Sequence, residues 1–278
     1  MRVQLLLLPL LAFAIALSTG CGKDGCTDPS ANNYDEDATR YDGSCTYDPI
    51  PAPAEPDTPN VVLKLQPLIG GSNLLLEELY QTSDGNTVRV ETFKIYMSNI
   101  RLVKTDDSEV LVRELALFDF DPDVMTTQLA LDVTPGDYKE VRFNLGLSET
   151  QNALDPTDFA QDHPLSNDQN MHWDWNSKFI FVKFDGRSDT TGTASNFDHN
   201  FAYHVGADEL YTEVTGLMET LTLADDTEAT VTINLEVEEF WSQGVQPIDL
   251  KVDNSTHTLN NMPLAQQFIG NVVAAFSN

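Results

Sequence analysis

The sequence predicts an all-β fold, an antiparallel, Greek-key-like β-sandwich with a C-terminal helix, and three observations support it. Residues 138–145 alternate between apolar and polar side chains, as a strand with one buried face does. Turn residues such as 84–86 (Asp-Gly-Asn) and 135–137 (Pro-Gly-Asp) separate similar runs. A helical period is clear only near the C-terminus. Closely spaced strands with few helices are typical of a sandwich or barrel.

The predicted strands are short runs rich in Val, Leu, Ile and Phe. They cover residues 61–65, 87–90, 93–97, 100–103, 110–120, 129–133, 138–145, 178–184, 201–205, 217–223 and 230–237. The helix is predicted where Leu264, Phe268, Val272 and Phe276 recur at a helical spacing, with Pro263 in its first turn. We expect the apolar side of this helix to cap the sandwich.

Residues 1–20 have the pattern of a lipoprotein signal peptide. An apolar run over residues 5–17 follows Arg2 and is too short to span a bilayer. It leads into Ser18-Thr19-Gly20-Cys21, small residues before a cysteine, where a lipoprotein signal peptidase cleaves. We therefore expect a lipid on Cys21 to anchor the chain to a membrane, as an outer-membrane lipoprotein of the cell envelope. Periplasmic and surface-facing display both stay open, and an ordinary signal peptide with a chance cysteine is the alternative.

Residues 21–47 are expected to form a small spacer module held by a disulfide. With Cys21 lipidated, Cys26 and Cys45 remain as an even pair in an oxidising compartment, so we expect them to bond. The segment is rich in Asp, Asn and Gly and resembles a module common in secreted Bacteroidetes proteins. Residues 48–60, DPIPAPAEPDTPN, predict an extended linker, so the β domain is expected to cover residues 61–278.

A second interpretation of the acidic residues in the spacer is a calcium site. Asn33, Asp35 and Asp37 alternate as in a calcium loop. However, Ala38 stands where an EF-hand has glycine, and no bidentate glutamate follows at the right place. A spacer role is therefore favoured over calcium binding.

Charge and missing motifs exclude several functions. The chain has 44 acidic and 15 basic residues and a net charge of −29, so it repels phosphate backbones and we expect no nucleic-acid partner. It contains no GxSxG, HExxH, P-loop or Rossmann glycine motif, and no free thiol remains for catalysis. We therefore expect that the protein is not an enzyme, with a glycan-degrading enzyme as the weakest alternative.

The residues best suited to metal chemistry lie between positions 163 and 204. Four of the five histidines fall there, together with one methionine and two tryptophans: His163, His172, His199, His204, Met171, Trp173 and Trp175. Imidazole suits copper and zinc, and a thioether suits Cu(I). On a strand, the methionine and both tryptophans would share one face, and His172 would point to the other. Metal binding is one reading of this cluster, and ordinary core and surface packing is the other.

Short motifs in a fixed order give residues 61–278 a resemblance to the MbnP-like family, described beside methanobactin genes and related to copper-repressible surface proteins of methanotrophs. The matching segments are 96–102 (Y-x-S-N-I-x-L), 135–138 (P-G-x-Y), 143–146 (F-x-x-G), 163–165 (H-P-L), 171–175 (M-x-W-x-W), 184–186 (F-D-G) and 203–206 (Y-H-V-G). One departure is Lys178-Phe179, where the family pattern usually has Gly-Tyr.

The resemblance implies a copper-binding β-sandwich with His163 and His204 as first candidate ligands, and Met171, His172 and His199 are further candidates from the cluster. It also implies oxidation of Trp173, or else Trp175, to a kynurenine that assists copper binding, carried out by a partner dihaem peroxidase of the MauG type. The predicted function is therefore copper acquisition or handling in the envelope. The alternative is a non-metal cell-surface module that binds protein or glycan.

Overall fold

The computed structural model describes residues 22–278 except 57, 125–126, 174, 176–177, 190, 192, 194–196, 198, 218–219 and 226. The predicted signal peptide and Cys21, the predicted site of lipidation, lie outside the described residues. The chain forms two compact units, divided between Pro49 and Ile50. Within the described ranges, no helix has the length and apolar character needed to cross a membrane.

The first unit is the small module around Cys26 and Cys45. Strand β1 (Asp24–Gly25) pairs in parallel with β2 (Arg40–Tyr41). A disulfide joins the two cysteines with an S–S distance of 2.01 Å. The Asp28 carboxylate accepts hydrogen bonds from the backbone N–H and hydroxyl of Ser30, a local turn of the kind that Asp side chains form. Turns and one covalent bridge therefore organise this unit.

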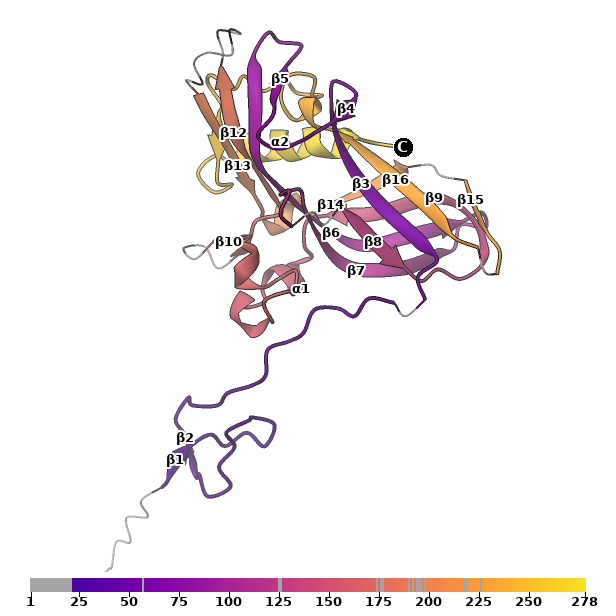
Figure 1. The fold of residues 1–278 in the computed structure, drawn as a ribbon. Helices are drawn as coiled ribbons and strands as arrows, with labels where there is room; N and C mark the ends of the chain where they lie inside the picture. The colour runs from indigo at the N-terminus through magenta and orange to yellow at the C-terminus, as the bar shows by residue number, and fades with distance from the viewer. Residues whose placement is uncertain are drawn as a thin grey trace, which may run out of the picture. The chain divides into compact units, whose positions relative to one another are not determined.

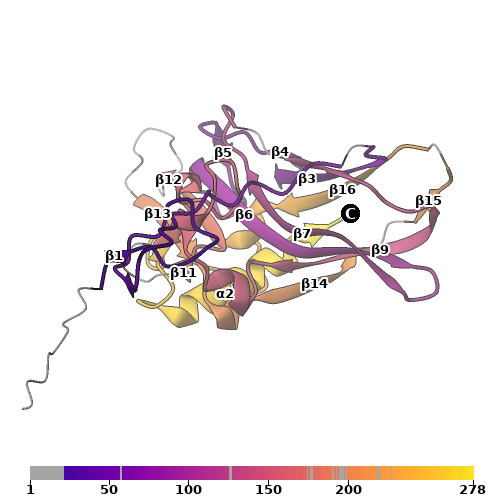
Figure 2. The same cartoon turned by 90° about the horizontal axis from the view of Figure 1, so that it is seen from below.

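The second unit confirms the predicted all-β sandwich with a C-terminal helix. Its larger sheet has the strand order β14-β9-β6-β12-β13-β17, with β15 on β9 and both β5 and β7 on β6; its smaller sheet has the order β18-β16-β3-β4, with β8 on β3. Figures 1 and 2 show β3 and β16 crossing one face of the larger sheet. The strands are β3 (Val61–Ile69), β4 (Ser72–Asn73), β5 (Leu79–Gln81), β6 (Thr87–Lys104), β7 (Glu109–Asp119), β8 (Gln128–Leu131), β9 (Gly136–Leu145), β10 (His172–Trp173), β11 (Lys178–Phe179), β12 (Val182–Asp189), β13 (His199–Val205), β14 (Thr212–Leu217), β15 (Leu221–Leu223), β16 (Ala229–Glu236), β17 (Ser255–Thr256) and β18 (Phe276–Ser277).

Strand pairing departs from the expected antiparallel pattern in two places. β3 and β16 run parallel, from Val61 opposite Ala229 to Leu68 opposite Glu236. β13 and β17 are also parallel. Such pairs join strands that are distant in sequence, so the local alternation of side chains carries no information about them.

Two predicted strand boundaries were wrong for identifiable reasons. The three runs predicted over residues 87–103 form the single strand β6. Asn99, between the second and third runs, has a left-handed conformation with φ 52°. The pairing with β7 shifts its register there and continues on the other side, so the strand does not end. The run predicted over 178–184 is broken after β11. There the N–H of Ile180 donates to the carbonyl of Met171, and the N–H of Phe181 donates to that of Val205.

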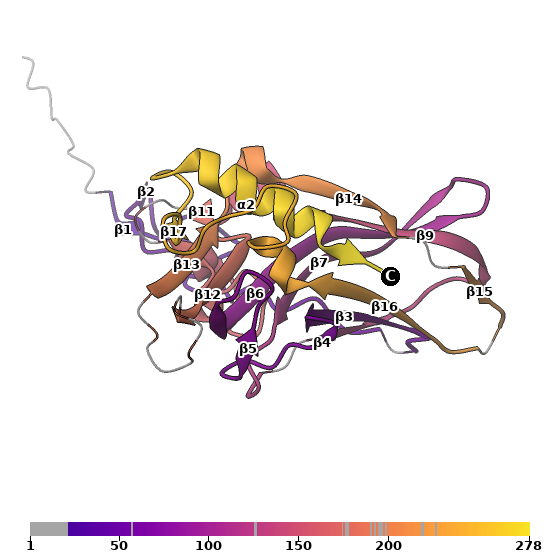
Figure 3. The ribbon, with the colours of Figure 1, turned by 90° about the horizontal axis from the view of Figure 1, so that it is seen from above.

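Helix α2 (Met262–Ala274) covers the end of the sandwich beside β13 and β17, as Figure 3 shows. The Asn261 side chain caps it by accepting from the N–H of Leu264. Its apolar side, including Phe268 and Val272, is buried. Phe276 was predicted to continue the helix but lies in β18, opposite Leu235. The remaining helical segments are short: α1 (Glu149–Asn152), η1 (Pro156–Asp158), η2 (Asn167–Gln169), η3 (Asp208–Leu210) and η4 (Val237–Phe240).

Part of the predicted linker packs on the β unit. Ile50 donates to the carbonyl of Asp158 and accepts from the N–H of Ala160, both at 2.7 Å. Further along, Glu55 forms an ion pair with Arg113 at 3.2 Å. Residues from Ile50 onward therefore belong to the same compact unit as the sandwich.

Candidate functional site

Glycines of the family-like motifs meet at one segment, residues 179–181. A Cβ atom added to Gly146 would lie 2.2 Å from the ring of Phe181, and one added to Gly206 would lie 2.2 Å from the carbonyl oxygen of Phe179. Real Cβ atoms do not approach this closely, so both positions require glycine. The segment pairs in turn with β10, where His172 lies opposite Phe179. The two glycines therefore position the strand that carries His172 and Trp173.

Two side chains of the 96–102 motif bond to other motif segments, and one of them holds the loop that contains His163. The hydroxyl of Tyr96 donates to the carbonyl of Pro164 at 2.6 Å, and the hydroxyl of Ser98 donates to that of Gly146 at 2.8 Å. Burial raises the pKa of Tyr96, so its hydroxyl stays protonated and remains a donor. Motifs that are distant in sequence thus form one hydrogen-bonded network.

His163 is buried, with 7% of its surface exposed, and stacks on Phe159 with ring centroids 4.2 Å apart. Burial lowers its pKa and favours the neutral ring. Its Nδ1 accepts a hydrogen bond from the N–H of Leu165 at 3.0 Å, so the proton of the neutral ring is on Nε2. Neither nitrogen then has a free lone pair. His163 can bind a metal ion only after it gives up the bond to Leu165.

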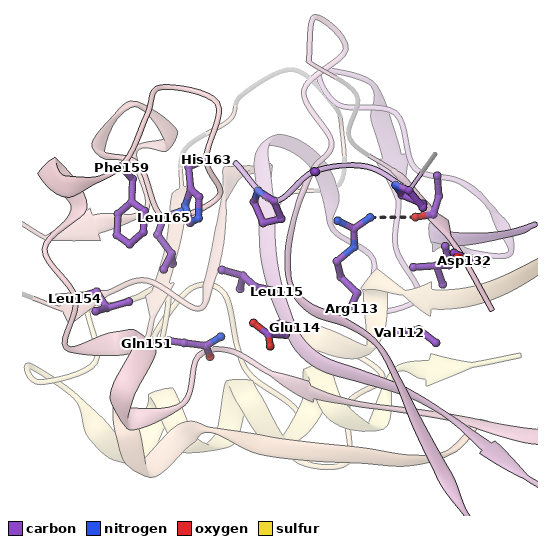
Figure 4. Close-up of a pocket in the computed structure, with 15 residues that line it drawn as sticks. Val112, Arg113, Glu114, Leu115, Asp132, Gln151, Leu154, Phe159, His163 and Leu165 are labelled. Atoms are coloured by element: carbon purple, nitrogen blue, oxygen red, sulfur yellow. Dashed lines mark hydrogen bonds between the residues drawn. The ribbon is translucent and has the colours of Figure 1, made fainter. Parts of the chain in front are cut away.

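A cavity of about 490 Å³ lies beside His163 (Figure 4). Apolar groups make up much of its wall, including Val112, Leu115, Leu131, Leu154, Phe159 and Leu165. The polar groups there include Arg113, which donates to the carbonyl of Ala130 at 3.0 Å. Residues 53–56 of the predicted linker contribute Pro53, Ala54 and Pro56. The size and lining are those of a small-molecule pocket.

The methionine and the two tryptophans lie in different surroundings. Met171 is 1% exposed and Trp173 is 5% exposed, whereas Trp175 is 62% exposed. The prediction that Trp175 shares a face with Met171 and Trp173 is therefore wrong, because β10 ends at Trp173. The two indole rings nevertheless contact each other, with centroids 5.6 Å apart. The buried Nε1 of Trp173 has no hydrogen-bond partner in the described part of the chain.

His172 packs on a core phenylalanine, and His199 lies at the far end of the strand that carries His204. His172 packs edge-on against Phe179 at 4.9 Å between ring centroids. His199 opens β13, opposite Ser188. It precedes His204 by five residues on this strand. That spacing corresponds to about 16 Å, too far for both rings to bind one ion.

His204 has a partner that the sequence pattern did not indicate. Its Nε2 lies 2.8 Å from Oδ1 of Asp185, and its ring centroid lies 4.9 Å from that of His257, at an interplanar angle of 79°. Burial and the neighbouring His204 both lower the pKa of His257. His257 lies outside the 163–204 cluster, and no sequence spacing pointed to it. Only the pairing of β13 with β17 brings it to His204.

No group of three or more His, Cys, Asp or Glu side chains among the described residues is arranged to hold a metal ion. The predicted ligands His163, His172, His199, His204 and Met171 therefore do not form one preassembled site there. Among the described residues, the imidazole rings of His204 and His257 do contact each other. Calcium in the spacer stays a prediction.

Comparison with known proteins adds a family match. The family model described as MbnP matches residues 58–267. A solved structure, MbnP from Methylosinus trichosporium, is similar at 12% sequence identity, with a TM-score of 0.49, over 72% of this chain and 83% of that chain. No curated protein matches.

Proposed function

Because the chain belongs to the MbnP family, we propose that it binds copper as its cargo in the cell envelope, for copper acquisition or handling. The lipid on Cys21, inferred from the pattern of residues 1–20, would hold it to a membrane, facing the periplasm or the outside. The observation that carries the proposal is the hydrogen bond between His204 and Asp185.

That hydrogen bond prepares His204 as a metal ligand. An ionised carboxylate only accepts hydrogen bonds, so Asp185 places the ring proton on Nε2, and the lone pair of Nδ1 has no donor among the described residues. Metal-binding histidines commonly donate their second N–H to a carboxylate in this way. Imidazole nitrogen is a good copper ligand, and a net charge of −29 favours cations near the protein.

Replacing the proposed ligand should weaken copper binding. We expect His204→Ala to lower the copper affinity of the purified protein by about tenfold or more. Loss of a residue that only hydrogen-bonds to a metal ligand already lowers metal affinity about 10- to 100-fold. Competition against a chromophoric chelator measures this affinity. His163→Ala serves as the comparison, because its Nδ1 is engaged by Leu165. A wild-type protein without copper affinity would refute the function. A loss of copper affinity in His163→Ala alone would identify His163, and not His204, as the ligand.

The tryptophan pair supports a second part of the proposal, oxidation of Trp173 to a kynurenine by a dihaem peroxidase of the MauG type. Trp175 is exposed to an external oxidant and contacts Trp173, whose Nε1 has no partner among the described residues. Peptide mass spectrometry of protein from its native host should find kynurenine at residue 173, and Trp173→Phe should lack it. Unmodified tryptophan in a copper-loaded native protein would reject this step and leave copper binding in place.

A non-metal interaction module is the second candidate function. The cavity beside His163 favours it, because its volume of about 490 Å³ and mixed lining suit an organic ligand or part of a glycan. The copper titration separates the two candidates, since this one predicts no copper affinity for the wild-type protein.

A further inference from the structure

We propose that His204 and His257 form a two-histidine site for a copper ion, a pair assembled by strand register and not by the cluster at residues 163–204. The inference rests on the proposed function for the identity of the metal. It adds His257, a residue that no motif of this chain includes, as a ligand.

Strand register places the two histidines side by side. In the parallel pair of β13 and β17, Ala202 lies opposite Ser255 and Tyr203 lies opposite Thr256. The next positions in the same register are His204 and His257. Residues at matched positions of neighbouring strands point to the same face, and the strands lie about 4.8 Å apart. The ring centroids, 4.9 Å apart, agree with this placement.

The separation of the rings suits a shared metal ion. Imidazole nitrogens bind Zn²⁺ at about 2.0–2.1 Å, and a copper ion held similarly by two of them would have ring centroids about 5–6 Å apart. The observed 4.9 Å lies just below this range.

Both rings can offer a lone pair. Asp185 holds the proton of His204 on Nε2, and Nδ1 makes no hydrogen bond with any described residue. Neither ring nitrogen of His257 makes a hydrogen bond within the described ranges. Two nitrogens with water in the remaining positions would complete the coordination. This arrangement requires no third side-chain ligand.

The segment that carries His257 is held tightly against β13. Thr258 is buried and has φ 60°, a left-handed conformation that is rare for a β-branched residue. Its hydroxyl accepts from the N–H of Gly206 at 2.9 Å and donates to the carbonyl of His204 at 3.4 Å. The side chain of Asn260 accepts from the N–H of His257 at 2.8 Å. Backbone strain that is maintained by such contacts is common at functional sites.

The test is titration of the purified protein with Cu²⁺ alone. Two quantities are measured: the affinity for Cu²⁺ and the electron paramagnetic resonance spectrum of the bound ion. The wild type should show hyperfine coupling to two imidazole nitrogens. His257→Ala and His257→Gln should each lower the affinity by about tenfold or more and leave coupling to one nitrogen. Ser255→Ala is the matched control, because Ser255 is an exposed residue of the same segment and has no imidazole. It should bind as the wild type does.

Two further measurements separate a lost ligand from a lost fold. The metal-free His257→Gln protein should keep the thermal midpoint of the wild type. Asp185→Asn should weaken Cu²⁺ binding by about tenfold and keep the two-nitrogen signal, because it changes only the group that orients His204. Wild-type affinity and two-nitrogen coupling in both His257 variants would overturn the pair while leaving copper binding intact. Absence of Cu²⁺ binding by the wild type would instead overturn the proposed function together with the pair.

Discussion

Replacing Gly146 with alanine is expected to lower the free energy of unfolding of the β unit by more than about 4 kcal/mol. Gly146 has φ 93°, and the new Cβ would lie 2.2 Å from the Phe181 ring. That ring has no room to move away, because Phe181 is fully buried. The backbone of Phe181 is also fixed. Its N–H donates to the carbonyl of Val205 at 2.7 Å, and its carbonyl accepts from the N–H of Tyr96 at 2.9 Å. The clash therefore adds to the backbone strain.

Urea unfolding followed by tryptophan fluorescence measures this loss. Gly216→Ala is the control, because Gly216 has a similar φ of 83° but no atom within 4 Å of the added Cβ. It should therefore lose only the cost of the left-handed conformation, about 1–2 kcal/mol. Equal losses in the two variants would show that the contact with Phe181 is unimportant.

The second large effect is expected from Phe184→Ala, a loss of about 3–5 kcal/mol in the free energy of unfolding. Phe184 is fully buried on β12 at the centre of an aromatic cluster. Its ring centroid lies 5.2–6.3 Å from those of Phe93, Phe201, Phe240, Trp241 and Phe268. Phe93 and Phe201 lie on strands of the larger sheet, Phe240 lies in η4 and Phe268 lies in α2. Rings held by separate elements cannot all move to close the space left by the removed ring.

Equilibrium denaturation again gives the magnitude. Leu111→Ala on β7 is the control, since Leu111 is 50% exposed and its truncation should change stability by no more than about 0.5 kcal/mol. A loss under about 1 kcal/mol in Phe184→Ala would mean that the cluster repacks, against the close packing described above.

Local patterns were sufficient for much of the fold. The alternation at residues 138–145 predicted β9, and the apolar runs at 61–65 and 230–237 predicted β3 and β16. A strand with one buried face must alternate, whatever its partner is, so its existence is visible in the sequence. Its partner is not visible, and the parallel pairing of β3 with β16 was missed for that reason.

The same division holds for the candidate site. By itself the sequence determined which metal-binding side chains the chain contains. It also determined the motif glycines, and the structure shows that two of them are closely packed. Tertiary structure alone decided the surroundings of each histidine. It engages Nδ1 of His163 with Leu165, and it brings His257 beside His204 through the register of β13 and β17. Register between distant strands depends on long-range packing, which spacing along the chain does not encode.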